Sequence, residues 1–228
     1  MPLSPLQERV VTVVGALPEA GEFGLAGGAA LIAWGIGDRV THDLDFFAKL
    51  SETVDRAAPA VEQALRSDGL DVEVVRVSPG FVRLQIGDGN ETTELDLAWD
   101  YRMRELGHVQ HGRILDRDEL AADKMLALYG RAEARDFVDV YRLRSLYSRE
   151  QLCELAHEKD RGFVTNMFAE ALRGIDRRDR FEFDVDATTF AALKREFSEW
   201  VRELGIDRRL ERNRDSPSLK PPDLGLEP

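Results

Sequence analysis

Thr41-His42-Asp43-Leu44-Asp45-Phe46-Phe47 is the stretch of the sequence that decides the fold. Acidic and apolar residues alternate in it, as they do in a strand with one buried face. Leu44 and Phe46 are expected to point into the core, and Asp43 and Asp45 to lie side by side on the other face. Two adjacent carboxylates repel each other, and Mg²⁺, which prefers a few carboxylates plus phosphate oxygens, would relieve that repulsion. Solvated aspartates on a strand edge are the structural alternative.

The segments around this strand predict an α+β arrangement. Residues 23–26 form a short apolar strand that runs into Gly27-Gly28 and then a helix. Apolar residues with helical spacing predict helices at 5–17 and 51–69, and period-two alternation predicts strands at 72–77, 81–86 and 93–99.

From Asp116 onward the apolar period changes to that of a helix. Asp116 and Glu119 have the spacing of a capping box. Helices are expected near residues 134–146, 150–158, 163–174 and 187–204. The predicted fold class is therefore α+β, with an N-terminal mixed-sheet core over residues 1–115, a helical C-terminal region over 116–210 that completes the cleft, and a disordered tail over 211–228.

Composition and charge exclude several classes of protein. The net charge of −12 argues against indiscriminate nucleic-acid binding, although Arg173, Arg177, Arg178 and Arg180 could form a local basic patch. Solvated helix ends are the alternative reading of that arginine cluster. The longest uncharged stretch, residues 23–37, is shorter than the roughly 20 residues of a membrane-spanning helix. No membrane contact is expected, and the absence of a secretory signal favours the cytoplasm.

Three further features strengthen the case for a site at Asp43 and Asp45. Gly27-Gly28 opens a helix, so bare backbone amides could approach a phosphate. Asp96 lies on a later predicted strand, where a third carboxylate would be expected. Lys124 is near the border of the apolar face of its helix and could present its ammonium group to the cleft. Taken singly, these are more often a glycine turn, a solvated aspartate and a surface lysine.

Together these residues resemble the DNA polymerase β-like nucleotidyltransferase superfamily, and more closely its AbiEii/AbiGii-type toxin family, which includes the mycobacterial MenT toxins. The resemblance covers roughly residues 23–146. Gly27-Gly28 stands where the superfamily often has Gly-Ser. The other matching motifs are Arg39-x-Thr41-x-Asp43-Leu44-Asp45-Phe46-Phe47, the helix that carries Lys124, and Arg131 with Arg135-Asp136-Phe137-Val138-Asp139-Val140-Tyr141.

The resemblance implies transfer of a nucleoside monophosphate from an NTP, with pyrophosphate leaving. Asp43 and Asp45 would hold Mg²⁺ or Mn²⁺, and Asp96 would complete the site and help to activate the acceptor hydroxyl. Lys124 would neutralise the triphosphate. The other implied nucleotide-binding residues are Gly27, Gly28, Arg39 and Thr41. The family motif also places Asp136 at the active site, whereas the structural alternative pairs Asp136 or Asp139 with Arg131, Arg135 or Arg142.

The resemblance also implies the toxin of a bacterial toxin-antitoxin system, with the 3′ end of a tRNA as acceptor and a cognate antitoxin as a possible partner. The arginine cluster at residues 173–180 would contact the RNA. Alternatives are a small-molecule or protein acceptor, or a non-catalytic nucleotide-binding module. A glycosyltransferase is disfavoured because its Asp-x-Asp motif usually comes later in the chain. Lys124→Ala is expected to weaken NTP binding or turnover strongly, whereas Lys159→Ala or Lys194→Ala should have little effect on either.

Overall fold

The computed structural model describes residues 3–37, 39–110 and 112–215, with side chains as far as residue 205. Its centre is a seven-stranded mixed sheet in the order β3-β4-β5-β2-β1-β7-β6. The strands are β1 (Gly24–Ala26), β2 (Asp43–Ala48), β3 (Asp71–Ser78), β4 (Phe81–Gly87), β5 (Thr92–Trp99), β6 (Gly107–Val109) and β7 (Gly112–Ile114). Strands β2 and β5 run parallel, and β1 lies antiparallel to β2.

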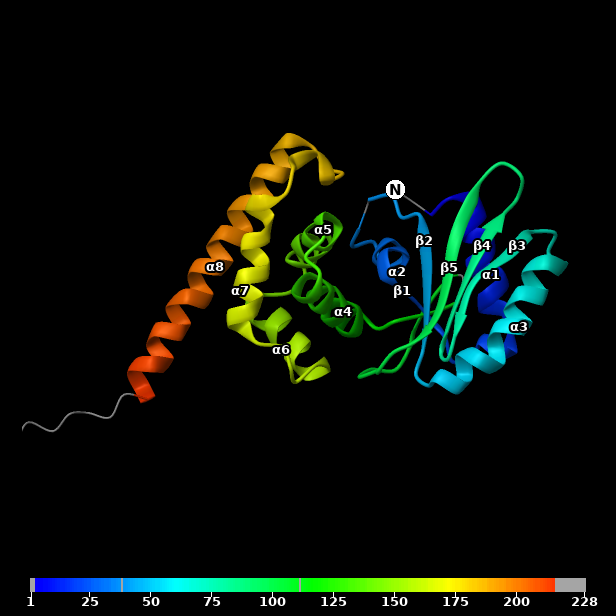
Figure 1. Cartoon of the computed structure of the whole chain (residues 1–228), viewed down its shortest axis with the longest axis horizontal. Helices are drawn as coiled ribbons and strands as arrows, with labels where there is room; N and C mark the ends of the chain where they lie inside the picture. The colour runs from blue at the N-terminus through cyan, green and yellow to red at the C-terminus, as the bar shows by residue number, and fades with distance from the viewer. Residues whose placement is uncertain (1–2, 38, 111, 216–228) are drawn as a thin grey trace, which may run out of the picture.

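The helices divide between the two sides of this sheet, as Figure 1 shows. Helices α1 (Pro5–Ala16) and α3 (Ser51–Ser67) cover one face, and α2 (Gly27–Ala33) lies beside β1 and β2. The helical C-terminal half follows, with α4 (Arg117–Gly130), α5 (Ala134–Leu143), α6 (Arg149–Lys159), α7 (Thr165–Arg173) and α8 (Ala187–Asp215), and short 3₁₀ turns at Pro18–Ala20, Gly174–Arg177 and Arg180–Glu182. The predicted α+β class is confirmed.

Strand β2 has the predicted alternation. Leu44 and Phe46 are 0% and 2% exposed, whereas Asp43 and Asp45 remain partly accessible on the other face. On the apolar side, Val54, Val61 and other residues of α3 are completely buried against the sheet. The sheet therefore has an apolar face under α1 and α3 and a charged face toward the helical half.

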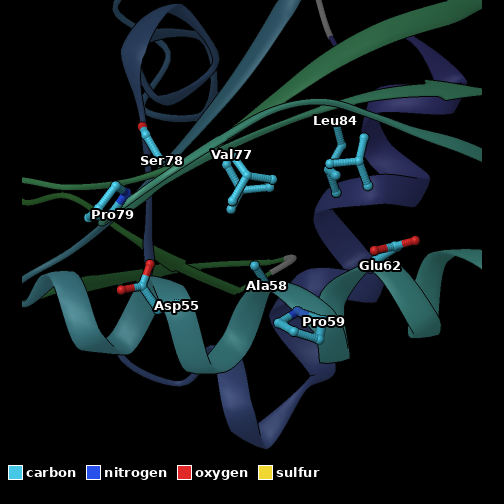
Figure 2. Close-up of a pocket in the computed structure, with 10 residues that line it drawn as sticks. Asp55, Ala58, Pro59, Glu62, Val77, Ser78, Pro79 and Leu84 are labelled. Atoms are coloured by element: carbon cyan, nitrogen blue, oxygen red, sulfur yellow. The ribbon is translucent and has the colours of Figure 1, made fainter.

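An apolar groove of about 560 Å³ lies between α3 and the hairpin of β3 and β4 (Figure 2). It is lined by residues that include Ala58, Val77 and Leu84. Val77 pairs with Val82, on the core side of the hairpin, so the groove belongs to the face opposite the carboxylates. Strand β3 is at the edge of the sheet, and α3 leaves Val77 66% exposed there.

The structure differs from the sequence prediction at three places. The hairpin of β6 and β7 was not predicted, because strands of three residues are too short to display a period. Helix α8 continues to Asp215, into the predicted tail, and residues 216–228 lie outside the described part of the chain. Asp116 caps α4 through the Asp118 amide, but the capping box is wrong because Glu119 accepts hydrogen bonds from the amides of Met103 and Arg104 instead.

No helix in the described ranges is long and apolar enough to cross a membrane.

Candidate active site

The register of the central strands brings three predicted aspartates onto the charged face. Asp45 of β2 is the direct neighbour of Asp96 on β5, and Asp43 is the neighbour of Glu94. Side chains two apart on a strand share a face, and directly opposed residues of paired strands do as well. Asp43, Asp45 and Asp96 therefore lie on one face of two adjacent strands, although Asp96 is more than fifty residues away from the other two in the sequence.

The glycine pair lies against this face. Ala26 pairs with Asp45, and Gly27 has a positive φ of 62°, which favours glycine. A Cβ on Gly27 would collide with Asp45 Oδ2. One on Gly28 would come within 2.8 Å of both Thr41 Oγ1 and Arg39 Nη2. The two glycines thus keep open the space between β2 and the start of α2.

Asp43 has two polar neighbours. The Thr41 hydroxyl, itself buried, donates a hydrogen bond to Asp43 Oδ1 at 2.9 Å. Arg135 on α5 approaches Asp43 Oδ2 with its Nη1 at 3.7 Å. The contact from Arg135 reaches across from the helical half, so both halves of the molecule contribute to the site.

Lys124 and Arg39 share one buried carboxylate. Lys124 Nζ is 2.9 Å from Asp139 Oδ2, and Arg39 donates to both Asp139 oxygens at 2.8 and 3.1 Å. Asp139 is completely buried. Burial by itself would raise the pKa of Asp139, but Lys124 and Arg39 outweigh it and lower that pKa below its ordinary value. Asp139 thus holds two cations near the glycine pair, and Asp43 and Asp45 supply negative charge to the same region.

Asp136 has a different setting. Arg131 donates to both of its oxygens at 2.9 and 2.8 Å, and the Glu133 amide donates to Asp136 Oδ2 at 3.0 Å. Asp136 is completely buried in this arrangement at the start of α5. The geometry of Asp136 is thus that of the structural alternative, an ion pair with Arg131, and Asp139 is the residue of this motif that contacts Lys124.

The electrostatics of Asp45 reflect the crowded carboxylates. Burial and the nearby charges of Asp43 and Asp96 together raise the pKa of Asp45 to about 6, against the lowering effects of Lys124 and Arg135. An acid with a pKa of about 6 has a strong preference for a nearby positive charge, because such a charge stabilises its ionised form.

Asp96 carries a partner that the sequence analysis missed. Arg83 on β4 lies directly opposite Asp96 and donates to its two oxygens at 2.7 and 2.6 Å. The antiparallel pairing of β4 and β5, joined by the turn at Asp88 and Gly89, was the available signal for this pair.

A divalent cation fits Asp43 and Asp45. In residues 3–37, 39–110 and 112–215, no group of three or more Asp, Glu, His or Cys side chains is arranged to hold a metal ion. Mg²⁺ usually takes only one or two carboxylates and completes its shell with substrate phosphates and water. The space that Gly27 leaves beside Asp45 Oδ2 meets that requirement, since a side chain there would fill it.

The predicted arginine cluster and Lys159 lie outside this group of carboxylates. Arg178 Nε donates to the Ala132 carbonyl at 2.6 Å, which ties the arginine cluster to the turn before α5. Within the cluster, Arg173 pairs with Glu170 and Arg178 with Glu182. Lys159 is buried, with its side chain 5% exposed, and it contacts three carboxylates, those of Asp100, Glu119 and Asp123.

Comparison with known proteins decides the family. The nucleotidyl transferase AbiEii toxin family of type IV toxin-antitoxin systems matches residues 14–212. The chain belongs to the AbiEii family. It is a nucleotidyltransferase of the toxin class, and proteins of this family generally use an NTP and a divalent metal and have an antitoxin partner.

Solved structures share the fold of this AbiEii-family chain. JHP933 from Helicobacter pylori has a TM-score of 0.54 at 17% identity, over 94% of this chain and 100% of its own. The nucleotidyltransferase toxin MenT4 from Mycobacterium tuberculosis has a TM-score of 0.57 at 17% identity, over 90% of this chain and 84% of its own. A search of the curated proteins finds no significant match.

Proposed function

We propose that this toxin transfers a nucleoside monophosphate from an NTP to the 3′ end of a tRNA, with Mg²⁺ or Mn²⁺ at Asp43 and Asp45. The observation that carries the proposal is the strand register, in which Asp45 lies beside Asp96 and against Gly27. The acceptor hydroxyl oxygen forms a bond to the α-phosphorus, the bond between the α- and β-phosphates breaks, and pyrophosphate leaves.

The triphosphate would rest on the positive side of the site. Lys124 and Arg39, held by Asp139, supply positive charge there. Gly27 and Gly28 leave room for phosphate oxygens near the backbone. Helix α2 has only seven residues, so the side-chain cations, rather than a helix dipole, would neutralise most of the phosphate charge.

The carboxylates would serve the transfer step. A divalent cation bound at Asp43 and Asp45 supplies charge neutralisation for the transferred phosphoryl group. Asp96 would accept the proton of the acceptor hydroxyl, because it is the carboxylate next to Asp45 on the neighbouring strand. Thr41, which donates to Asp43, would fix the orientation of that carboxylate.

The acceptor would contact the arginine cluster of the helical half. Arg178 bonds to Ala132, three residues before Arg135, which reaches Asp43, so the cluster is connected to the site. Phe181 is 85% exposed, and Arg180 lies over its ring at 5.4 Å from the centroid. An exposed aromatic ring next to arginines favours stacking with unpaired bases, such as those at a tRNA 3′ end.

The test is incubation of the purified chain with each labelled NTP and total tRNA, followed by sequencing of RNA 3′ ends. Label is expected in tRNA, and Asp45→Ala should abolish it while the circular dichroism spectrum stays unchanged. The double charge reversal Arg173→Glu/Arg177→Glu should weaken RNA labelling and its salt dependence but not NTP binding.

Parallel reactions with a protein mixture and with a hydroxylated small molecule test the acceptor. Label in either of these and in no RNA would overturn the tRNA proposal and leave the nucleotidyltransferase class intact. Full activity of Asp45→Ala would overturn the assignment of the carboxylates.

A further inference from the structure

Both oxygens of Asp96, the third carboxylate of the site, accept hydrogen bonds from Arg83. The guanidinium donates from Nε to Oδ1 and from Nη2 to Oδ2, a two-pronged geometry that is the strongest of the arginine–carboxylate arrangements. The side chain of Asp96 is only 12% exposed, and that of Arg83 is 38% exposed. Water therefore screens the Asp96 end of the pair less than an ordinary surface ion pair.

The ion pair with Arg83 bears on how Asp96 could take part in cation binding. A cation at Asp96 would compete with Arg83, because the guanidinium already occupies one lone pair on each carboxylate oxygen. An arginine guanidinium keeps its positive charge near neutral pH, so Arg83 cannot relieve the competition by losing a proton. Two positive charges at one carboxylate would repel each other.

A second carboxylate is ready to receive Arg83. Glu94 lies two residues before Asp96 on β5, and its Oε2 is 3.2 Å from Arg83 Nη1. Phe81 lies on the same strand as Arg83, with the guanidinium carbon 5.9 Å from the ring centroid. Arg83 could therefore leave Asp96 for Glu94 by a small side-chain rotation, without losing an ionic partner.

We propose that Arg83 is a positioning residue that withholds Asp96 from divalent cations and releases it by moving to Glu94. The inference rests on the proposed function, in which Asp43 and Asp45 hold the cation. In the resting protein, Asp43 and Asp45 alone bind a cation weakly. The cation that accompanies the NTP, strengthened by the phosphate oxygens, displaces Arg83 and completes the set of carboxylates.

Mn²⁺ binding to the full chain without NTP, measured by electron paramagnetic resonance, tests this inference. Arg83→Gln should bind Mn²⁺ about three- to ten-fold more tightly than the wild type, because the competitor is gone. The Mn²⁺ affinity of Arg83→Lys should lie between those of Arg83→Gln and the wild type, since lysine keeps the positive charge but cannot form the two parallel hydrogen bonds. The matched control is Arg76→Gln, because Arg76 also lies over Phe81, at 5.5 Å, and no ion pair to Asp96 is found for it among the described residues.

A double-mutant cycle separates this mechanism from a general change of charge. Glu94→Gln should weaken Mn²⁺ binding, because Arg83 then has no second partner and stays on Asp96. In the Arg83→Gln background, Glu94→Gln should have much less effect. Strictly additive effects would mean that Glu94 does not act through Arg83, and this would overturn the inference.

Two further outcomes distinguish the inference from the proposed function. Equal Mn²⁺ affinity of Arg83→Gln and the wild type, together with loss of binding in Asp45→Ala, would overturn the role of Arg83 and leave the proposed site intact. No Mn²⁺ binding at all, with or without NTP, would overturn both.

Discussion

Lys124 and Lys159 are both buried, with side chains 9% and 5% exposed, but they differ in the ratio of cations to carboxylates around them. Around Lys124, one carboxylate, Asp139, serves two cations. Around Lys159, one cation serves three carboxylates, with Asp100 and Glu119 each at 2.7 Å and Asp123 also in contact. The first region carries surplus positive charge and the second surplus negative charge.

The two regions resolve their surplus in different ways. At Lys159 a proton can do so: burial raises the pKa of Asp123 to about 7, and Asp100 and Glu119 raise it, against the opposing effect of Lys159. At Lys124 the balancing charges are carboxylates of the same site, since Asp45 interacts with Lys124 and Asp43 with Arg39. The NTP triphosphate is proposed to bring further negative charge to this region, with the divalent cation offsetting Asp43 and Asp45.

Lys159→Met removes the lysine from the acidic region and should have the largest effect on stability. Removal of the cation that contacts Glu119 and Asp123, both largely buried, and the more exposed Asp100 is expected to cost about 3 to 5 kcal/mol of the free energy of unfolding at pH 8. Urea denaturation measures this loss. At pH 5.5 the loss should be smaller, since the carboxylates can then take up protons. An equal loss at both pH values would contradict the charge explanation.

Lys124→Ala removes one cation from the region around Asp139 and should impair catalysis without unfolding the protein. We expect kcat/KM for the NTP to fall about 100-fold, because an ammonium aimed at the triphosphate is lost. Steady-state kinetics with varied NTP measures the effect. Asp139→Asn should reproduce part of it through a higher KM, since Lys124 and Arg39 lose the carboxylate that positions them. Unchanged kinetics in both variants would remove the triphosphate from this region.

Asp123→Asn tests the raised pKa of Asp123 through the pH dependence of stability. The pKa of Asp123 is raised in the folded state from 3.8 to about 7, so the folded protein binds a proton that the unfolded chain lacks in this range. That contribution is complete below pH 4 and is lost as the pH rises through 7. The variant should therefore lose roughly 3 kcal/mol less stability than the wild type between pH 4 and 7, measured by urea denaturation. Parallel curves for the two proteins would contradict the raised pKa.

Lys194→Ala should have the smallest effect and serves as the matched control. Its side chain is 40% exposed, and its pair with Asp176 at 2.8 Å is at the surface. We expect a change of less than about 0.5 kcal/mol in the free energy of unfolding and unchanged kcat/KM. A large effect on kcat/KM would show that loss of any lysine is enough to impair the enzyme.

The sequence predicts local structure well where a period is long enough to be read. The strand predicted at residues 43–47 is β2, Asp43–Ala48, and the helix predicted at 51–69 is α3, Ser51–Ser67. Both segments show their buried side in the sequence, because apolar residues recur at intervals of two or of three to four. The place of Asp43 and Asp45 on a shared, accessible face follows from the same alternation.

Contacts between elements were harder to predict. Asp136 and Asp139 lie three apart on one helix, and which of them meets Lys124 depends on how α4 and α5 pack. Arg83 and Asp96 meet only because the register of β4 and β5 places them opposite each other. Lys159 reaches Asp123 from another helix. No period within one segment contains this information.

Gly27 should tolerate no substitution in a genetic selection. A methyl group there would strike Asp45 Oδ2, and the left-handed backbone at φ 62° would also strain any other residue. In a selection for bacterial colonies that survive expression of this toxin, codon 27 should therefore be recovered as an inactivating position alongside codons 43 and 45. Survivors with Gly27→Ala would retain full-length protein, detectable by immunoblotting, and would provide a harmless form for large-scale expression.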